Sequence, residues 1–357
     1  MGKTVTFLMP SVQLMPSGGY KIVYEYANRL VGDGFSVNII MPAWIDFRNY
    51  NLKYKLKGGY NYLRYHIIGK PEVNWFDLDN RVKLFVTTSL NETCIPKSDV
   101  IICTGASTAI PLSKYQNISD SKKYYFIQGY ETWSVGYEML METYRLNLKK
   151  IVIADWLKEK VQEVGENAEI AYNGFDFGYF KLSTPIENRN RYTIVMPYNK
   201  VKLKGCDIGF KALEIVHSKY PQLKVYLYGV HKPKSIPSYC SFYYKPKRDQ
   251  HNLILNDSAI FLGPSYSEGF CLTVAEAMQC GCAPVCTNIG GYTVTCKDGN
   301  TALVGEVGNP ESLAENIIKL IENDNLRFQI ANNANIFIKQ YTWDSAYTTF
   351  KKIINLT

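Results

Sequence analysis

Two glutamates have the type and spacing that suit chemistry on an anionic ligand. Glu268 and Glu276 are separated by seven residues, and Glu268 lies in a loop, residues 263–270, that follows the apolar run 258–262. Such a run is typical of a buried strand, and a helix is predicted to begin near Thr273. The first N–H groups of a helix have no partner within the helix, so a loop that ends at a helix start is a ready anion site. We expect both carboxylates to face one pocket there.

Both glutamates also have a plainer interpretation. Thr273 and Glu276 fit the capping-box pattern, in which Glu276 would only cap its own helix. Glu268, taken alone, is typical of a solvated loop residue.

The elements that must position these residues form two similar series. Strands are expected in the first half at residues 4–9, 35–41, 99–103, 123–128 and 151–154, and in the second half at 193–196, 223–228 and 258–262. Helices are expected at 20–31, 204–220, 250–256, 273–280 and 310–322. Alternation of this kind predicts an α/β fold of two doubly wound, Rossmann-like domains facing across a cleft, with ligands beyond the carboxyl ends of the strands. The region from Ile45 to Arg81 has weak periodicity, and we expect it to form strands and loops.

Composition narrows the function classes. The chain has 357 residues and a formal net charge of +8, which fits an anionic ligand or an anionic membrane face. Its basic residues lie in short clusters rather than one stripe, so nucleic acid is not implied. No apolar run approaches the roughly 18 residues of a membrane span, and no signal-peptide layout is present, which predicts a cytoplasmic protein.

No metal site is expected. The nine cysteines include no C-x-x-C pair, and Cys280, Cys282 and Cys286 are interpreted as buried thiols rather than zinc ligands. Asp77 and Asp79 have the spacing of an Asp-x-Asp metal pair, but they lie in the irregular region and are interpreted as a surface coincidence.

The second half of the sequence resembles the family-four retaining glycosyltransferases of GT-B fold. The resemblance rests on P-S-x-x-E-G-F at 264–270, A-E-A-M at 275–278, G-C-A-P-V at 281–285, the Gly290-Gly291 pair, Lys204-Gly205, the segments 172–176 and 298–304, and the closing helix 309–321. This resemblance implies an enzyme that moves a sugar from a nucleotide donor to an acceptor hydroxyl, keeps the anomeric configuration and needs no metal or other cofactor.

The resemblance also implies roles for single residues. Glu268 would hold the donor sugar and Lys204 its diphosphate, so these two are the expected catalytic residues, while Glu276 would bind the ribose. The amides of Gly269, Phe270, Cys271, Leu272 and Thr273 would add dipoles at the diphosphate. Gly18 and Gly19 match the family's glycine-rich loop after the first strand, where a missing side chain allows close approach to the donor phosphates or the acceptor. An ordinary tight turn is the alternative for this pair.

One departure from the family pattern concerns the phosphate contacts. The family carries an Arg five residues before the lysine of its K-G pair, and here Asn199 takes that position. Lys200 or Lys202 could supply the charge without the bidentate geometry of Arg, or could simply belong to a solvated loop.

The string Y-F-I-Q-G-Y-E-T-W at 125–133 resembles a subgroup that includes rhamnosyltransferases of bacterial surface-glycan assembly. Gln128, Tyr130 and Glu131 would then bind the acceptor. Trp133 would stack on a sugar or fill a helix–sheet interface. The resemblance tilts the donor towards a dTDP-linked sugar, with UDP-linked sugars next. It implies a glycan or lipid-linked acceptor in surface polysaccharide synthesis, with peripheral contact to anionic lipid at the inner membrane face.

Domain boundaries follow from the polar, proline-containing segment 181–191, which is the best linker candidate. We expect an acceptor-binding domain at 1–180, a nucleotide-sugar-binding domain at 190–340 and, as in relatives, a helix at 341–357 that packs back on the first domain. Two alternatives remain open: a non-catalytic GT-B protein that binds sugar nucleotides, which Asn199 favours, and a sugar-nucleotide epimerase.

Overall fold

The computed structural model describes residues 2–13, 15–45, 52–68 and 73–356. The chain divides into two compact units: unit 1 is Met1–Tyr172 with Ala346–Thr357, and unit 2 is Asn173–Ser345. Within the described ranges, no helix combines the length and apolar character needed to cross a bilayer.

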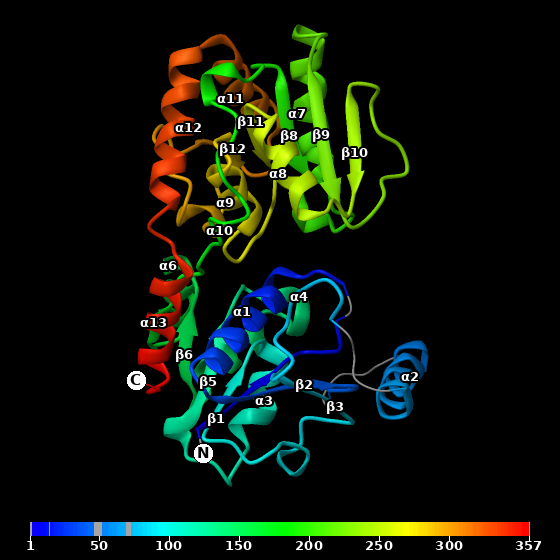
Figure 1. The fold of residues 1–357 in the computed structure, drawn as a ribbon, viewed down its shortest axis with the longest axis vertical. Helices are drawn as coiled ribbons and strands as arrows, with labels where there is room; N and C mark the ends of the chain where they lie inside the picture. Colours follow the sequence, from blue (N-terminus) through cyan, green and yellow to red (C-terminus); the bar gives the residue numbers. More distant parts are fainter. Residues whose placement is uncertain (1, 14, 46–51, 69–72, 357) are drawn as a thin grey trace. The chain divides into compact units, whose positions relative to one another are not determined.

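Unit 1 is built on a seven-stranded, wholly parallel sheet of order β3-β2-β1-β4-β5-β6-β7 (Figure 1). Its strands are β1 (Thr4–Leu8), β2 (Ser36–Pro42), β3 (Lys83–Thr87), β4 (Val100–Cys103), β5 (Lys123–Ile127), β6 (Lys149–Val152) and β7 (Ala168–Ile170). Its helices are α1 (Gly18–Gly32), α2 (Leu52–Ile68), α3 (Ala106–Ser113), α4 (Thr132–Val135), α5 (Tyr137–Arg145), α6 (Asp155–Gln162) and α13 (Trp343–Ile353), of which α13 begins in the last residues of unit 2.

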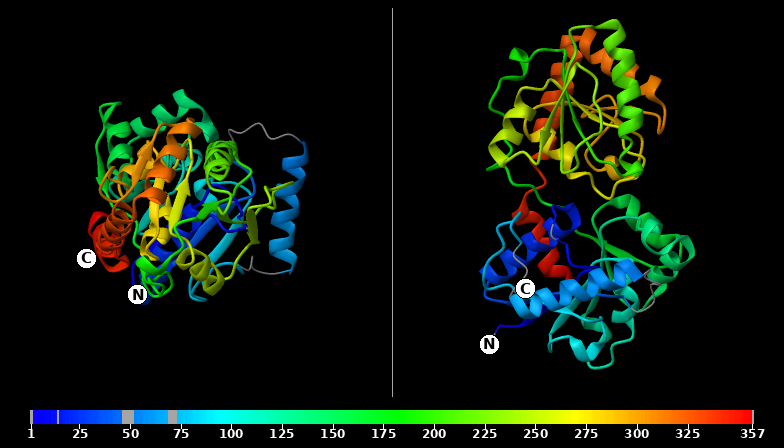
Figure 2. Two further views of the ribbon diagram at one scale, coloured as in Figure 1. Left: turned by 90° about the horizontal axis from the view of Figure 1, so that it is seen from above. Right: turned by 90° about the vertical axis from the view of Figure 1, so that its right-hand side faces the viewer.

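Unit 2 repeats this plan with a six-stranded parallel sheet of order β10-β9-β8-β11-β12-β13, whose first five strands are labelled in Figure 1. Figure 2 shows the same ribbon from two further sides. Its strands are β8 (Thr193–Pro197), β9 (Lys224–Gly229), β10 (Cys240–Tyr244), β11 (Ile260–Gly263), β12 (Ala283–Thr287) and β13 (Leu303–Gly305). Its helices are α7 (Cys206–Lys219), α8 (Arg248–Asn256), α9 (Leu272–Gln279), α10 (Gly290–Thr293), α11 (Pro310–Glu322) and α12 (Asp324–Ile338). The predicted fold class, two doubly wound Rossmann-like domains, is confirmed.

The strand orders locate the point in each sheet where ligands usually bind. In unit 1 the order reverses between β1 and β4, and in unit 2 between β8 and β11. Loops leave such neighbouring strands in opposite directions and open a crevice beyond the carboxyl ends of the sheet. The loops after β8 and β11 carry Lys204 and Glu268.

The expectation of strands and loops for Ile45–Arg81 is wrong for α2, whereas residues 73–81 do form turns and irregular segments. Residues Leu52–Ile68 form the helix α2, whereas residues 46–51 and 69–72 lie outside the described residues. The helical period escaped notice because the apolar side chains of α2 do not point to a core: Leu52, Leu56, Tyr60, Leu63 and Ile67 are exposed.

The aromatic core of unit 1 includes the end of the chain. Phe350 on α13 is fully buried and stacks on Tyr26 of α1 with ring centroids 4.0 Å apart. Its ring also lies 5.6 Å from Phe126 of β5 and 6.5 Å from Phe7 of β1. The last helix therefore covers the same sheet face as α1.

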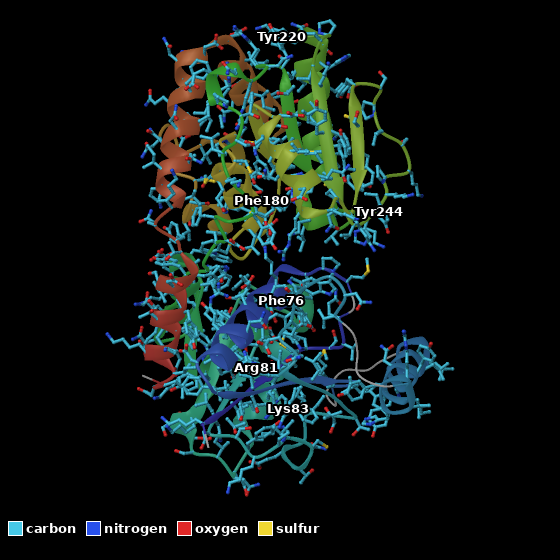
Figure 3. All side chains as sticks on the ribbon, viewed as in Figure 1. Phe76, Arg81, Lys83, Phe180, Tyr220 and Tyr244 are labelled. Atoms are coloured by element: carbon cyan, nitrogen blue, oxygen red, sulfur yellow. The ribbon has the colours of Figure 1, made fainter. Side chains whose placement is uncertain are left out.

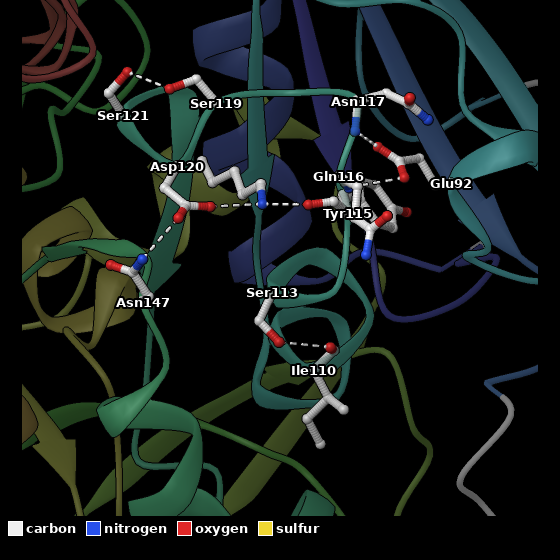
Figure 4. Close-up of polar contacts among 11 residues, drawn as sticks. Glu92, Ile110, Ser113, Tyr115, Gln116, Asn117, Ser119, Asp120, Ser121 and Asn147 are labelled. Atoms are coloured by element: carbon white, nitrogen blue, oxygen red, sulfur yellow. Dashed lines mark hydrogen bonds and ion pairs between the residues drawn. The ribbon is translucent and has the colours of Figure 1, made fainter.

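A buried lysine at the start of β5 is satisfied by a polar cluster at the amino end of the unit 1 sheet (Figure 4). Lys123 Nζ donates to Tyr115 O at 2.5 Å and to Asp120 Oδ1 at 2.7 Å. Asn147 Nδ2 donates to the other oxygen of Asp120 at 2.8 Å. This ammonium therefore has its partners, and it lies at the edge of the sheet opposite the strand ends discussed below.

Candidate functional site

A lysine–glutamate pair forms the centre of the candidate site in unit 2. Lys204 Nζ lies 2.8 Å and 2.7 Å from the two carboxylate oxygens of Glu268, and Ser265 Oγ donates to Glu268 Oε1 at 2.9 Å. Burial alone would lower the pKa of Lys204, but the Glu268 carboxylate outweighs it and the net shift is upward. The ammonium therefore stays charged at neutral pH. The structure brings together two residues that are 64 positions apart in the sequence.

A close backbone contact fixes the lysine. Lys204 ends the single 3-10 turn η4 (Lys202–Lys204), and Gly205 follows in the left-handed region with φ +61°. A Cβ built on Gly205 would lie 1.9 Å from the carbonyl oxygen of Pro264. Tyr266 N also donates to Leu203 O at 2.8 Å. The loop after β8 is thus seated on the loop after β11, and only glycine fits at the junction.

The glutamate is held from the other side by the end of β12 and the start of α10. A Cβ on Gly291 would lie 2.4 Å from the carbonyl oxygen of Glu268 and 2.5 Å from its Cβ. Thr287 Oγ1 donates to Ser265 O at 2.5 Å. The segments after β8, β11 and β12 therefore converge on Glu268, which explains why the second glycine of the Gly290-Gly291 pair has no side chain.

The helix after Glu268 begins one residue earlier than expected, and this changes the role of Glu276. Cys271, with φ +47°, is the N-cap of α9, and Leu272 is its first residue. Glu276 is then the fifth helical residue, too far along for a capping box, so that interpretation is wrong. Tyr228, at the end of β9, is buried, and burial raises its pKa, with the Glu276 carboxylate raising it further. Glu276 and Tyr228 therefore lie within electrostatic reach of each other.

The residues before α9 offer main-chain rather than side-chain groups. Phe270 is buried, with its ring centroid 5.7 Å from that of Phe175, and Cys271 is buried as well. Burial, reinforced by Glu268, raises the pKa of Cys271 to about 12, so its thiol is neutral. Together with Gly269, Leu272 and Thr273, these residues surround the start of α9, and the first N–H groups of a helix, which have no partner within the helix, favour an anion.

Asn199 has a structural partner in the same loop as Lys204. Its Oδ1 accepts a hydrogen bond from Val201 N at 3.0 Å, and its own N–H donates to Cys206 Sγ at 3.3 Å. The side chain shapes the turn and contributes no charge. The lysines at 200 and 202 are exposed.

A second group of predicted residues gathers beyond the carboxyl ends of the unit 1 strands. Gln128 directly follows β5, and its amide lies 3.5–3.7 Å from the position of a Cβ on Gly19. Its Oε1 is buried and accepts no hydrogen bond from the described residues. Glu131 Oε2 accepts from Ala106 N at 2.9 Å, at the start of α3. Gly19, Gln128 and Glu131 therefore meet near the switch point between β1 and β4.

Two expectations for this region need correction. Gly18 and Gly19 lie in the first turn of α1 rather than in a loop, and the ordinary contact distance at Gly19 does not require glycine. Trp133 is 72% exposed, so it does not fill a helix–sheet interface. Tyr130 packs beside Trp156 with ring centroids 6.2 Å apart, and Lys160 Nζ lies 5.7 Å from its ring centroid.

Sequence reasoning missed four residues of these two groups. Tyr228 gave no signal, because a strand tyrosine is common everywhere. Ser265 and Gly291 were noticed only as parts of motifs. Gly105, where a Cβ would lie 3.2 Å from Glu131 Oε2, could have been found, because a glycine that follows the strand at a switch point marks a helix start.

Cys280, Cys282 and Cys286 are buried. Across the described ranges, no group of three or more His, Cys, Asp or Glu side chains is placed to hold a metal ion. The Asp79 carboxylate is bound by Arg81, at 3.0 Å and 2.7 Å.

Comparison with known proteins supports the family assignment for unit 2. Residues 184–337 match the family described as glycosyl transferases group 1. An uncharacterized glycosyltransferase of Methanocaldococcus jannaschii is 25% identical over 189 residues, which cover 53% of this chain and 51% of that protein. The capsular polysaccharide biosynthesis glycosyltransferase CapM of Staphylococcus aureus is 26% identical over 228 residues, 57% of this chain and 59% of CapM. The chain thus spans about half the length of these curated relatives.

Solved structures match nearly the whole chain, at identities that show the fold alone. HepE of Anabaena, in complex with UDP and glucose, has a TM-score of 0.72 at 15% identity, and the match covers 99% of this chain and 100% of the HepE chain. Sucrose-phosphate synthase of Thermosynechococcus elongatus has a TM-score of 0.73 at 11% identity, with 99% and 98% covered. The chain therefore has the GT-B fold, and the match to the glycosyl transferases group 1 family extends over residues 184–337.

Proposed function

We propose that this protein is a retaining glycosyltransferase that moves a sugar from a nucleoside-diphosphate donor, dTDP- or UDP-linked, to a hydroxyl of a glycan or lipid-linked glycan. The family match of residues 184–337 supports sugar transfer, and the similarity to CapM supports a surface polysaccharide as the product. The complex of HepE with UDP and glucose supports a UDP-linked donor, and the resemblance of residues 125–133 is the basis for a dTDP-linked one. A rhamnosyltransferase-like member of the family is the most specific form of this proposal.

The observation that carries the proposal is the Lys204–Glu268 pair beside the start of α9. A departing nucleoside diphosphate accumulates negative charge, and a fixed ammonium with free helix N–H groups stabilises that charge most in the transition state. When a donor binds, Lys204 exchanges the Glu268 carboxylate for the diphosphate. Glu268 is then free to accept hydrogen bonds from the sugar hydroxyls, while Glu276 accepts from the ribose.

The acceptor is proposed to bind unit 1 at Gln128, Tyr130 and Glu131. The buried Oε1 of Gln128 is an acceptor that a sugar hydroxyl can satisfy, and an unpaired buried acceptor is costly otherwise. Glu131 Oε2 accepts a hydrogen bond from the amide of Ala106, which holds the carboxylate at the start of α3.

The transfer step keeps the configuration if the acceptor attacks the face that the leaving group departs from. The bond between the acceptor oxygen and the anomeric carbon forms as the bond from that carbon to the phosphate oxygen breaks. The acceptor proton passes to the departing phosphate oxygen, so no protein nucleophile is needed.

Asn199 favours a second candidate, a GT-B protein that binds sugar nucleotides without turning them over. Its side chain is neutral and is held by Val201 N, so the phosphate contacts lack the Arg of the family pattern.

Donor hydrolysis and thermal unfolding, measured together, test the proposal. We expect UDP or dTDP to raise the melting temperature. At a nucleotide concentration of a hundred times the dissociation constant, the free energy of unfolding should increase by about 2.7 kcal/mol. We expect Lys204→Ala and Glu268→Gln to lower hydrolysis by about 10²–10³-fold, the usual cost of removing a group that stabilises transition-state charge. Lys211→Ala and Glu315→Gln are matched controls, because both residues are exposed in unit 2.

Two outcomes contradict transferase activity. Hydrolysis that Glu268→Gln leaves unchanged would remove the proposed role of the pair. A nucleotide that stabilises the wild-type protein without any hydrolysis or transfer would favour the non-catalytic binder.

A further inference from the structure

Helix α2 of unit 1 presents a row of exposed apolar side chains. Leu52, Leu56, Tyr60, Leu63 and Ile67 are between 56% and 77% exposed. Their spacings of four, four, three and four residues place them on one face of the helix. Single exposed apolar residues are normal on a protein surface, but five along one helix are a contiguous patch of the kind that marks an interaction site.

The opposite face of α2 is tied to the sheet, so the exposure of this row is a consequence of how the helix is seated. The Tyr65 hydroxyl donates to Leu84 O, and a ring nitrogen of His66 lies 3.2 Å from Val86 O. Both carbonyls belong to β3, the edge strand of the unit 1 sheet, beside which α2 is drawn in Figures 1 and 3.

A glycine sets the orientation of the helix. Gly58 is buried, and a Cβ there would lie 2.5 Å from Trp44 Nε1 and 2.8 Å from Ala43 O. Trp44 Nε1 in turn donates to Lys55 O at 3.3 Å. Because the helix backbone contacts Trp44 at Gly58, where there is no side chain, the apolar row is held outward.

The charge of α2 selects among possible occupants of this surface. Its seventeen residues include Lys53, Lys55, Lys57 and Arg64 and no Asp or Glu, and the side chains of Lys55 and Arg64 are exposed. A second copy of the same helix would bring like charges together. An anionic surface would be complementary, as is the net charge of +8 of the whole chain.

We propose that α2 is a membrane-docking helix that lies in the plane of an anionic lipid bilayer. Its apolar row enters the boundary between headgroups and acyl chains, and its basic residues contact lipid phosphates. Helices that bind in this way have a basic polar face and an apolar face rather than a long continuous apolar run. Docking would hold the protein where a lipid-linked substrate is concentrated, but it requires neither nucleotide nor catalysis.

Vesicle flotation without nucleotide or acceptor tests this proposal. The full chain is mixed with vesicles of phosphatidylglycerol and phosphatidylcholine, or of phosphatidylcholine alone. We expect at least tenfold tighter binding to the anionic vesicles, and a marked loss of binding in 0.5 M salt, because salt screens the attraction. L56E/L63E should bind at least tenfold more weakly.

The matched control is L253E/I336E, which places two glutamates at exposed apolar positions of α8 and α12 in unit 2. We expect it to bind within about twofold of the wild type, because its substitutions lie off the proposed docking face and add the same charge as L56E/L63E. Circular dichroism of each variant verifies the fold.

Three outcomes would overturn the proposal: no vesicle binding by the wild type, equal loss in both double variants, or a dimer in size-exclusion chromatography that L56E/L63E dissociates while vesicles bind neither form. Because the assay contains no donor, its result is independent of whether the protein transfers sugar.

Discussion

Replacing Gly205 by alanine tests how the lysine of the candidate site is positioned. An added Cβ would meet Pro264 O at 1.9 Å, so the two loops must separate by about 1.1 Å to reach the 3.0 Å below which real Cβ contacts essentially never fall. The left-handed backbone at Gly205 costs a non-glycine residue roughly 1–2 kcal/mol. Forced separation of packed groups adds typically 1–3 kcal/mol. We therefore expect Gly205→Ala to lower the free energy of unfolding by about 2–5 kcal/mol.

Gly299 supplies a matched control in the same unit. Its φ is +69°, close to that of Gly205, but nothing lies within 4 Å of a Cβ built on it. Gly299→Ala should therefore cost only the backbone strain, roughly 1–2 kcal/mol. The difference between the two variants isolates the contact with Pro264.

Denaturant unfolding followed by circular dichroism measures both variants against the wild type. Thermal-shift measurements of nucleotide binding show whether the displaced loop carries Lys204 away from its position. A misplacement of 1 Å can also lower activity by about 10²-fold. Equal destabilisation by the two substitutions would refute the reasoning, because it would mean that the loops give way at no cost.

Two further predictions concern the C-terminal helix. Phe350→Ala removes a fully buried ring that contacts Tyr26, Phe126 and Phe7, and we expect a loss of about 3–5 kcal/mol in denaturant unfolding; a loss below 1 kcal/mol would mean that α13 is not part of the core of unit 1. Hydrogen bonds from Lys351 and then Tyr347 lower the pKa of Asp33 below its usual 3.8, so the stabilisation is present at neutral pH and is lost as the pH falls through the folded-state pKa. Asp33→Asn should lower the free energy of unfolding at pH 7 by at most about 1 kcal/mol, because the group is so exposed. The melting temperatures of the variant and the wild type should therefore differ slightly at pH 7, and this difference should shrink between pH 5 and pH 3. A constant difference across that range would contradict the assignment.

The alternating apolar runs predicted the class of the fold because a buried parallel strand must be apolar on both faces, whatever surrounds it. Helix α2 escaped this logic for a physical reason. Its apolar row faces outward, the poor helix formers Gly58 and Gly59 lie in its middle, and its inner face is held by Trp44 and two strand carbonyls. Periodicity that does not serve a core is hard to recognise without the sheet beside it.

The candidate site shows a similar division between local and tertiary information. The anion-binding character of the loop before α9 follows from local chain order. The pairing of Lys204 with Glu268 and the contact of Gly291 with Glu268 arise only when the loops after β8, β11 and β12 are brought to one edge of the sheet. The capping-box interpretation of Glu276 failed because the true N-cap, Cys271, is not a residue type that marks helix starts.

The return of the last twelve residues to unit 1 makes unit 2 an insertion within it. Asn173–Ser345 is one continuous stretch, whereas unit 1 is assembled from both ends of the polypeptide. A ribosome therefore releases the first 172 residues before the helix that completes their aromatic core has been synthesised. Unit 1 cannot complete its core until α13 has been made, and a fragment that stops at residue 172 lacks Phe350 altogether.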